Sequence, residues 1–283
     1  MNENILYAKP LVEKEILELR DRVEKLKHKP RLVIIKIGKD KASDKYVQNK
    51  IKRCAEVGVI SEIVEFTETV SQREVELEVL RRGCYNNVTA ILLQLPIPKH
   101  LNVDEIMLEM NSKKDVDGFT IENVGAMVLG QEGNVPCTAR GVIDLLKFYN
   151  IEIEGKDVVI VNRSNIVGKP LMNMFLNEDA TVTVCHSKTT NLREKVKAAD
   201  IVISAIGKAD FFDVDSFKEG SVIVDVAINF DSEGKMCGDV KKSDYEKLAN
   251  KGCKITPVPN GIGQMTTLEL IKQTVEIAEG ECI

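Results

Sequence analysis

The sequence predicts an α/β protein of two domains, each built around a mostly parallel sheet. Short β-branched runs alternate along the chain with segments whose apolar residues recur at helical spacing, which is the pattern of β–α–β units. A chain of 283 residues is also long enough for about two domains of ordinary size. The stretch GQEGNVP at 130–136 is the best candidate for a linker between them.

The first half of the chain opens with an apolar stripe that predicts a helix from Pro10 to Lys27, entered through a proline. Ser43 is a suitable N-cap for a second helix, which Gly58 would terminate after Val57. The other elements expected in this half are strands at 31–37, 59–66 and 90–95, helices from Ser71 and over 103–110, and a polar loop at 112–118.

The second half repeats the alternation. A helix around 140–149 leads into strands at 158–161, 180–185, 201–205 and 221–226, with helical segments between them. The final helix, over 265–278, is expected to pack back on the first domain. The predicted domains, flanking a cleft, are therefore 1–134 plus 265–283 and 135–264.

Charge and composition exclude several classes of protein. The chain carries 39 basic and 44 acidic residues, a net charge of −5, and has no basic tract, so neither nucleic acid nor a membrane surface is an expected partner. No apolar run approaches the roughly 18 residues of a membrane span, and the polar start MNENILYAK does not have the pattern of a signal peptide. Seven scattered cysteines without a C-x-x-C pair predict reduced thiols in a cytoplasmic protein, and the three histidines add no metal site.

The stretch GKDVVIVNRSNIVGKP, at 155–170, has the order of a Rossmann unit: a buried strand, a tight polar turn and a helix start. Such a unit presents backbone N–H groups to a pyrophosphate. The pattern G-x-G-x-x-G is absent because Asn162, Ser164 and Val167 occupy its glycine places. An ordinary strand-to-helix turn is therefore an equally good interpretation of this stretch alone.

The end of the next strand favours NADP over NAD. Sites selective for NAD carry an acid there for the ribose 2′-OH, whereas this chain has Cys185-His186-Ser187-Lys188. With Arg163 in the preceding turn, the residues suit a 2′-phosphate. His186 is interpreted as a binding or structural residue rather than a catalyst. Segments 205–207 and 226–229 follow strands and could line a nicotinamide pocket; the loop at 256–266 either closes over a ligand or is a simple turn.

In the first domain, Tyr46 and Lys50 are four residues apart and so share one helix face, with Ser43 one turn earlier. Gln94 stands at a strand end, where α/β proteins bind ligands. In the nearby loop, Asp115 and Asp117 offer carboxylates suited to a guanidine-like heterocycle. The alternatives are a solvated helix face for the first pair and, for the loop, an acidic surface turn or a metal loop that lacks enough further oxygens.

Taken together, these residues resemble the bifunctional methylenetetrahydrofolate dehydrogenase/methenyltetrahydrofolate cyclohydrolase family. The matching segments occur in the family's order and cover most of the chain. They are YVQNKIKRCAEVGV (46–59), ILLQLPIPKHL (91–101), KKDVDGF (113–119), PCTARG (136–141), RSNIVGKP (163–170), ATVTVCHSKTTNL (180–192), ADIVISAIGK (199–208) and TPVPNGIGQMT (256–266).

The resemblance implies oxidation of 5,10-methylenetetrahydrofolate by a nicotinamide cofactor, followed by hydrolysis to 10-formyltetrahydrofolate. By position, Lys50 is the catalytic amine. Tyr46 packs along the folate ring system and helps to orient the Lys50 amine, and Gln94 hydrogen-bonds this amine and tunes it. Asp117 holds the amino-pyrimidine edge of the pterin. Ser43 and Pro259 complete the folate site. The cofactor positions, for NADP or alternatively NAD, are Asn162, Arg163, Ser164, Ser187, Ile228, Thr138 and Thr266. The family also implies a homodimer formed through the cofactor domain.

The chain departs from the family pattern around the cofactor and the closing loop. Asn162 and Ala227 stand where glycine is usual, Ala139 replaces a proline, and Asn260 and Gln264 replace glycine and proline. No proposed catalytic residue is lost. Two alternatives stay open: a dehydrogenase that releases the methenyl product, and a non-catalytic folate- or nucleotide-binding protein.

Overall fold

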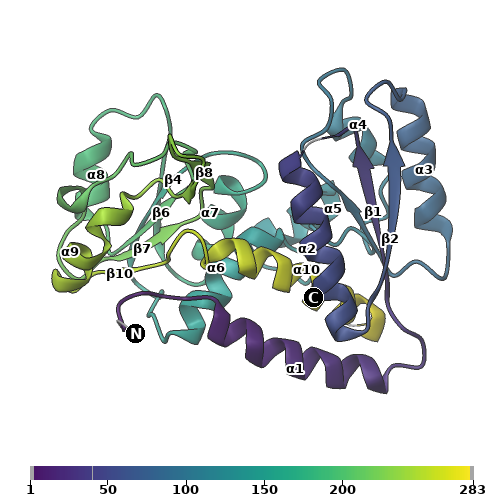
Figure 1. Ribbon diagram of the computed structural model, residues 1–283, viewed down its shortest axis with the longest axis horizontal. Coiled ribbons are helices and arrows are strands. Elements are labelled where there is room, and N and C mark those ends of the chain that lie inside the picture. Colours follow the sequence, from purple (N-terminus) through teal and green to yellow (C-terminus); the bar gives the residue numbers. More distant parts are fainter. Residues whose placement is uncertain (1–2, 40, 281–283) are drawn as a thin grey trace. The chain divides into compact units, whose positions relative to one another are not determined.

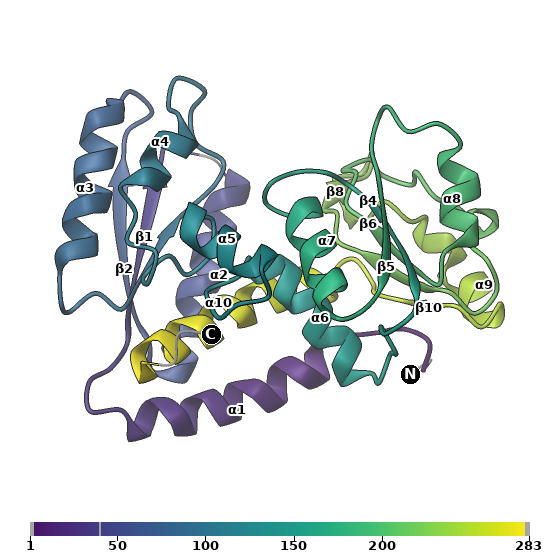
Figure 2. The same cartoon turned by 180° about the vertical axis from the view of Figure 1, so that it is seen from behind.

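The computed structural model describes residues 3–39 and 41–280, with the backbone alone for Lys41, Ala42, Ser43 and Lys45. Within this part the chain divides into two compact units. The five-stranded unit holds the chain up to Val12 and Thr138–Thr266, and the three-stranded unit holds Glu13–Cys137 and the chain from Thr267 on. Figures 1 and 2 show the ribbon from opposite sides.

The three-stranded unit is a parallel sheet in the order β2-β1-β3. Alternate side chains of the central strand, Val33, Ile35 and Ile37, pack with Val75 and Val79 of α3 on one face, where α4 also lies. Helix α2 lies on the other side of the sheet (Figure 1). These elements are β1 (Arg31–Ile37), β2 (Ile60–Phe66), β3 (Ala90–Leu93), α2 (Lys41–Val57), α3 (Gln72–Cys84) and α4 (Val103–Leu108).

Three further helices take part in this unit: α1 (Lys9–Lys25), α5 (Ile121–Val128) and α10 (Ile262–Glu279). The C-terminal ends of α1 and α10 are joined because Arg22 donates from Nε to Oε1 of Glu279 at 3.0 Å. The side chain of Ser71 accepts from the backbone N–H of Glu74, and the side chain of Glu74 accepts from the backbone N–H of Ser71. This capping box fixes the start of α3.

The five-stranded unit is a fully parallel sheet in the order β10-β7-β6-β4-β5. After β5 the chain crosses over β4 to form β6 on the opposite side, so the topology switches between β4 and β6. Ligands in such sheets bind outside the carboxyl ends of the strands at this switch point. The strands are β4 (Asp157–Val161), β5 (Thr181–Cys185), β6 (Ile201–Ser204), β7 (Val222–Asp225) and β10 (Lys254–Ile255).

Helices cover both faces of this sheet (Figure 2). Val196 of α8 and Leu248 of α9 pack with Val159, Val202 and Ile223 on one face, while α7 lies on the other. Burial on both faces explains the unbroken apolar runs in the central strands β4, β6 and β7, whereas the edge strand β5 is exposed at alternate residues. The helices are α6 (Cys137–Phe148), α7 (Gly168–Asn177), α8 (Leu192–Ala198) and α9 (Tyr245–Asn250), and a two-stranded hairpin joins β8 (Asn229–Phe230) to β9 (Met236–Cys237).

The predicted α/β class and parallel sheets are confirmed. Helix α2 begins at Lys41, three residues earlier than an N-cap at Ser43 would place its first residue, so Ser43 lies in its first turn. The sequence did not predict α5, the hairpin or β10, each of which is short. Nor did it anticipate that Ile5 pairs with Ile255 beside the five-stranded sheet. Within the described ranges, every helix is too short or too polar to span a membrane.

Candidate active site

Lys50 and Gln94 form the centre of the candidate site in the three-stranded unit. Helix α2 carries Lys50, which is 9% exposed, and Gln94 directly follows β3. The Lys50 Nζ donates to Oε1 of Gln94 at 2.7 Å. The amide nitrogen of Gln94 donates at 2.7 Å to the carbonyl of Leu95, and this second bond turns Oε1 toward the lysine.

Burial lowers the pKa of Lys50, and the nearby charge of Asp117 partly opposes this. An amide is a suitable neighbour because it accepts a hydrogen bond without adding the negative charge that would hold the lysine as an ammonium. Tyr46, one helical turn earlier, is half-buried, and burial raises the pKa of its phenol. The pair therefore offers a lysine that can release its proton and a tyrosine that keeps its own.

Asp117 and Asp115 have different surroundings although both lie in the loop before α5. Buried Asp115 accepts from the backbone N–H of Thr120 at 2.7 Å and from Asn123 at 3.2 Å, so it organises the loop itself. Asp117 is partly exposed and accepts from the backbone N–H of Cys137 at 3.1 Å. Of the two acids that the sequence indicated, Asp117 is the one with capacity for a ligand.

Gln273 supports this loop and was missed by sequence reasoning. It is fully buried in α10, and its Nε2 donates to the carbonyls of Val116 at 2.8 Å and Val135 at 2.9 Å. Its Oε1 accepts from the N–H of Val135 at 2.9 Å. The only signal in the sequence was an amide in an otherwise apolar helical stripe.

The turn after β4 is built around Asn162. The Oδ1 atom accepts from the backbone N–H groups of Ser164 at 2.7 Å and Gly168 at 3.1 Å. Its Nδ2 donates to the carbonyl of Ala205, after β6, at 2.6 Å. A Cβ on Gly168 would lie 2.3 Å from the carbonyl oxygen of Asn162, so only glycine fits there. The side chain of Asn162 therefore connects the segments after β4 and β6, across the topological switch point.

The candidate 2′-phosphate residues lie at one edge of the same sheet. Val161 and Cys185 pair in register, so the segments that carry Arg163 and Ser187 leave neighbouring strands at the same level. Arg163, Ser187 and Lys188 are exposed. His186 accepts the backbone N–H of Lys188 on Nδ1 at 3.2 Å, which supports a structural role for it.

The remaining predicted positions lie elsewhere in the described chain. Thr138 and Thr266, 128 residues apart in sequence, hydrogen-bond each other at 3.1 Å through their hydroxyl groups. Ile228 is 38% exposed and follows β7, and Pro259 is exposed in the loop before α10. The side chain of Ser43 lies outside the described part. Among the described residues, no cluster of His, Cys, Asp and Glu is arranged to hold a metal ion.

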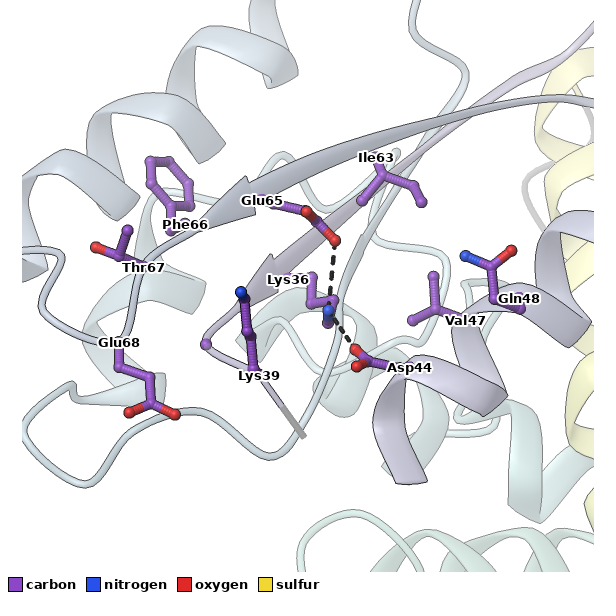
Figure 3. A pocket seen from close by; sticks show the side chains of 11 residues that line it. Lys36, Lys39, Asp44, Val47, Gln48, Ile63, Glu65, Phe66, Thr67 and Glu68 are labelled. Atoms are coloured by element: carbon purple, nitrogen blue, oxygen red, sulfur yellow. Dashed lines mark hydrogen bonds and ion pairs between the residues drawn. The ribbon is translucent and has the colours of Figure 1, made fainter. Parts of the chain in front are cut away.

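A hollow of about 960 Å³ in the three-stranded unit opens on a different face of α2. Figure 3 shows Lys36 between the carboxylates of Asp44 and Glu65, with Val47 and Gln48 lining one wall. The hydrogen bond to Asp44, together with the hydrogen bond to Glu65 and the charges of both acids, raises the pKa of Lys36 against the opposing effect of burial. The lining of the hollow does not include Lys50 or Gln94, and within it Lys36 forms ion pairs with Asp44 and Glu65.

Family comparisons cover both halves of the chain. Residues 6–117 match the tetrahydrofolate dehydrogenase/cyclohydrolase catalytic domain. Residues 136–282 match the NAD(P)-binding domain of the same family.

Individual relatives agree. The bifunctional protein FolD of Bacillus cytotoxicus is 44% identical over 278 residues, which are 97% of this chain and 96% of that protein. The crystal structure of FolD from Campylobacter jejuni is 42% identical, with a TM-score of 0.94 over 98% of each chain. The Trypanosoma brucei dehydrogenase-cyclohydrolase, solved with NADP and an inhibitor, is 33% identical, with a TM-score of 0.90 over 98% of this chain and 97% of that one. The resemblance is confirmed, and this chain belongs to the tetrahydrofolate dehydrogenase/cyclohydrolase family.

Proposed function

We propose that this chain oxidises 5,10-methylenetetrahydrofolate with NADP and then hydrolyses the methenyl product to 10-formyltetrahydrofolate. Both family domains are present, and relatives that align over nearly the whole chain are bifunctional. The observation that carries the proposal is the buried lysine–amide pair, Lys50 and Gln94, joined at 2.7 Å. Both steps use this arrangement for different reasons.

The first step generates positive charge near the lysine. When hydride leaves the one-carbon bridge, the N–C–N unit of the folate becomes cationic, and NADP supplies the acceptor for that hydride. A neutral amine is tolerated beside this cation better than an ammonium. The lowered pKa of buried Lys50 therefore favours the oxidation.

In the second step, water adds to the cationic methenyl carbon and loses a proton. The bond from this carbon to N5 then breaks as a proton reaches N5, and the formyl carbonyl forms with release of the other water proton to solvent. Lys50 is the group that accepts the first water proton and returns it to N5, because its lowered pKa brings the amine toward the working pH. Gln94 holds its Nζ in place. Tyr46 packs along the folate and orients the amine, with Ser43 and Pro259 as further folate contacts.

Asp117 binds the amino-pyrimidine edge of the pterin. A carboxylate accepts two N–H donors of a guanidine-like ring in parallel, which gives both affinity and orientation. The backbone N–H of Cys137 occupies part of one carboxylate oxygen and leaves the rest of the group for the ligand. As functional domains we propose 1–134 plus 265–283 for folate and 135–264 for the cofactor, although the described residues up to Val12 belong to the compact five-stranded unit.

The cofactor site uses the residues around the switch point of the five-stranded sheet. Arg163 and Ser187 bind the 2′-phosphate of NADP, since no acid follows β5 to select a free ribose. The cofactor's other contacts come from Asn162, Ser164, Ile228, Thr138 and Thr266. We place the protein in the cytoplasm as a homodimer; the free thiols of the described cysteines fit that compartment.

A spectrophotometric assay with 5,10-methylenetetrahydrofolate, run separately with NADP and NAD, tests the proposal. We expect NADPH to form without accumulation of the methenyl product. Methenyl accumulating in step with reduced cofactor would indicate a dehydrogenase alone. No turnover in a protein that still binds folate would contradict the catalytic proposal.

Lys50→Met separates the two steps. It should abolish hydrolysis while hydride transfer continues, so the methenyl product accumulates. Lys52→Met is the matched control, because Lys52 is an exposed lysine on the same helix. Equal loss of both steps in Lys50→Met would contradict the proposed role and indicate a binding or folding defect.

A further inference from the structure

The carboxylate of Asp239 is fully buried in the five-stranded unit and accepts five hydrogen bonds from protein groups. Oδ2 accepts from Oγ of Ser204 and from the N–H of Ile206, both at 2.7 Å. Oδ1 accepts from the N–H of Gly207 at 3.1 Å, the N–H of Lys208 at 2.8 Å and Nδ2 of Asn229 at 3.0 Å. Both oxygens are thus engaged in charge-assisted bonds.

These donors come from two segments that follow neighbouring strands. Ser204 ends β6 and Asn229 begins β8 after β7, and Ser204 pairs with Asp225 in the parallel register. Three successive N–H groups, from Ile206 to Lys208, converge on one anion and form a concave nest of backbone donors. Asp239 therefore fixes the path of the loop after β6 and ties it to the segment after β7.

The same loop is held on its other side by the turn after β4. Nδ2 of Asn162 donates to the carbonyl of Ala205 at 2.6 Å, across the topological switch point. The loop 205–208 therefore stands between the Asn162 turn and the Asp239 carboxylate. Its location, outside the carboxyl ends of strands at a switch point, is where open α/β sheets bind their ligands.

The segment that carries Asp239 is itself anchored. The carboxylate of Asp225, at the end of β7, accepts the N–H of Val240 at 2.8 Å. A Cβ on Gly238 would lie 2.0 Å from Oδ2 of Asp225, so the chain can pass there only as glycine. Asp239 is thus presented from a fixed backbone toward the loop that it holds.

We propose that Asp239 is a positioning residue for the nicotinamide end of the cofactor site, acting through the loop 205–208 and Asn229. The inference rests on the proposed location of that end beside segments 205–207 and 226–229. Asp239 does not touch the cofactor; it sets the positions of backbone groups that do. Its removal therefore changes cofactor binding and leaves the folate residues Lys50, Gln94 and Asp117, in the other unit, unchanged.

Steady-state kinetics of Asp239→Asn test this. An asparagine of the same size turns an NH₂ group toward at least one of the five donors, so the loop must shift. We expect the KM for NADP to rise about tenfold or more. We expect the KM for 5,10-methylenetetrahydrofolate and the rate of methenyl hydrolysis to stay within about twofold of wild type, since an undisturbed site leaves binding energies unchanged.

Asp244→Asn is the matched control. Asp244 is also buried in this unit, and it accepts from Val214 at 3.2 Å and from Lys247 at 2.9 Å, with no bond to the strand-end loops. It should lower the melting temperature and leave the KM for NADP unchanged. The rise in melting temperature that NADP produces should persist in Asp244→Asn and shrink in Asp239→Asn.

If Asp239→Asn does not fold, the double variant Ser204→Ala/Asn229→Ala tests the same network, because it removes two of the five donors and keeps the carboxylate. An unchanged KM for NADP in a folded variant would overturn the inference, as would equal losses for NADP and folate. A wild-type protein that does not reduce NADP would instead contradict the proposed function, so the two failures are distinguishable.

Discussion

Lys50 and Gln94 are joined by a 2.7 Å hydrogen bond between a helix and the end of a strand. The bond links a buried ammonium-forming group to a neutral acceptor whose own orientation is fixed by the Leu95 carbonyl. The arrangement holds the amine in one place without stabilising its charged form as a carboxylate would. The arrangement therefore suits a reaction in which Lys50 must act as a neutral amine.

Replacing Gln94 by glutamate should convert this neutral contact into an ion pair. An opposite charge within hydrogen-bonding distance favours the ammonium, so the pKa of Lys50 should rise. The limb of the pH–rate profile of methenyl hydrolysis that reports Lys50 should move to higher pH by about one unit or more. Gln48→Glu, at an exposed position of the same helix, should leave the profile in place. An unchanged profile in Gln94→Glu would show that Lys50 is not the titrating group.

Gly118 sets the position of Asp117 in the loop. Its φ is +64°, and an added Cβ would lie 2.5 Å from the backbone oxygen of Asn134. Gly118→Ala should therefore displace Asp117, raise the KM for folate about tenfold or more, and leave the KM for NADP unchanged. Gly125→Ala is the control, since a Cβ there meets nothing within 4 Å in α5. It should leave the KM for folate unchanged and stabilise the protein by up to about 1 kcal/mol.

The sequence predicted most of the fold because most of its longer strands, though not the edge strands β2 and β5, are buried on both faces. Such strands read as unbroken β-branched runs, as in Val158–Val161, and need no knowledge of distant partners. Lys50 and Gln94 were also predictable, one from helical spacing and the other from its place at a strand end. Gln273 and Asp239 were not, because their hydrogen-bond partners are far away in sequence.

Three of the five departures from the family pattern, Asn162, Asn260 and Gln264, have local explanations that only the structure supplies. Asn260 has a φ of 82°, the left-handed region that favours glycine and that asparagine tolerates best among other residues. Its Oδ1 accepts from Nε2 of Gln264 at 3.2 Å, so two departures compensate each other. Asn162, a third, fills its turn with hydrogen bonds to Ser164, Gly168 and Ala205.

Arg163 should decide the choice between NADP and NAD. A guanidinium binds a phosphate through paired donors, and the 2′-phosphate is the group that distinguishes the two cofactors. Arg163→Ala should reduce kcat/KM with NADP by about 10- to 100-fold and change kcat/KM with NAD little. Arg193→Ala, on α8, should change neither ratio. Equal losses of kcat/KM with NADP and with NAD would show that Arg163 contacts a group that both cofactors carry rather than the 2′-phosphate.

Asp225 should make the stability of the protein depend on pH in an unusual direction. Burial, reinforced by the charge of Asp239, raises the pKa of this carboxyl to about 7 in the folded protein, from an ordinary value of 3.8. Between these values the folded state binds the proton more tightly than the unfolded chain. The free energy of unfolding should therefore fall as pH rises toward 7, by at most about 1.4 kcal/mol per pH unit from this group, and level off above 7.

Urea unfolding of the wild type and of Asp225→Asn, measured from pH 5 to pH 8, isolates this contribution. Asparagine does not titrate, so the difference between the two proteins should change across that range and become constant above the folded pKa. The same comparison can be made in the Asp239→Asn background, where the neighbouring charge is absent. The pH at which the difference in unfolding free energy levels off should then be lower, because a like charge no longer disfavours ionisation of Asp225. A difference between wild type and Asp225→Asn that is the same at every pH would show that Asp225 is ionised throughout. The bond from the Val240 N–H to its carboxylate would then be strong enough to offset its burial.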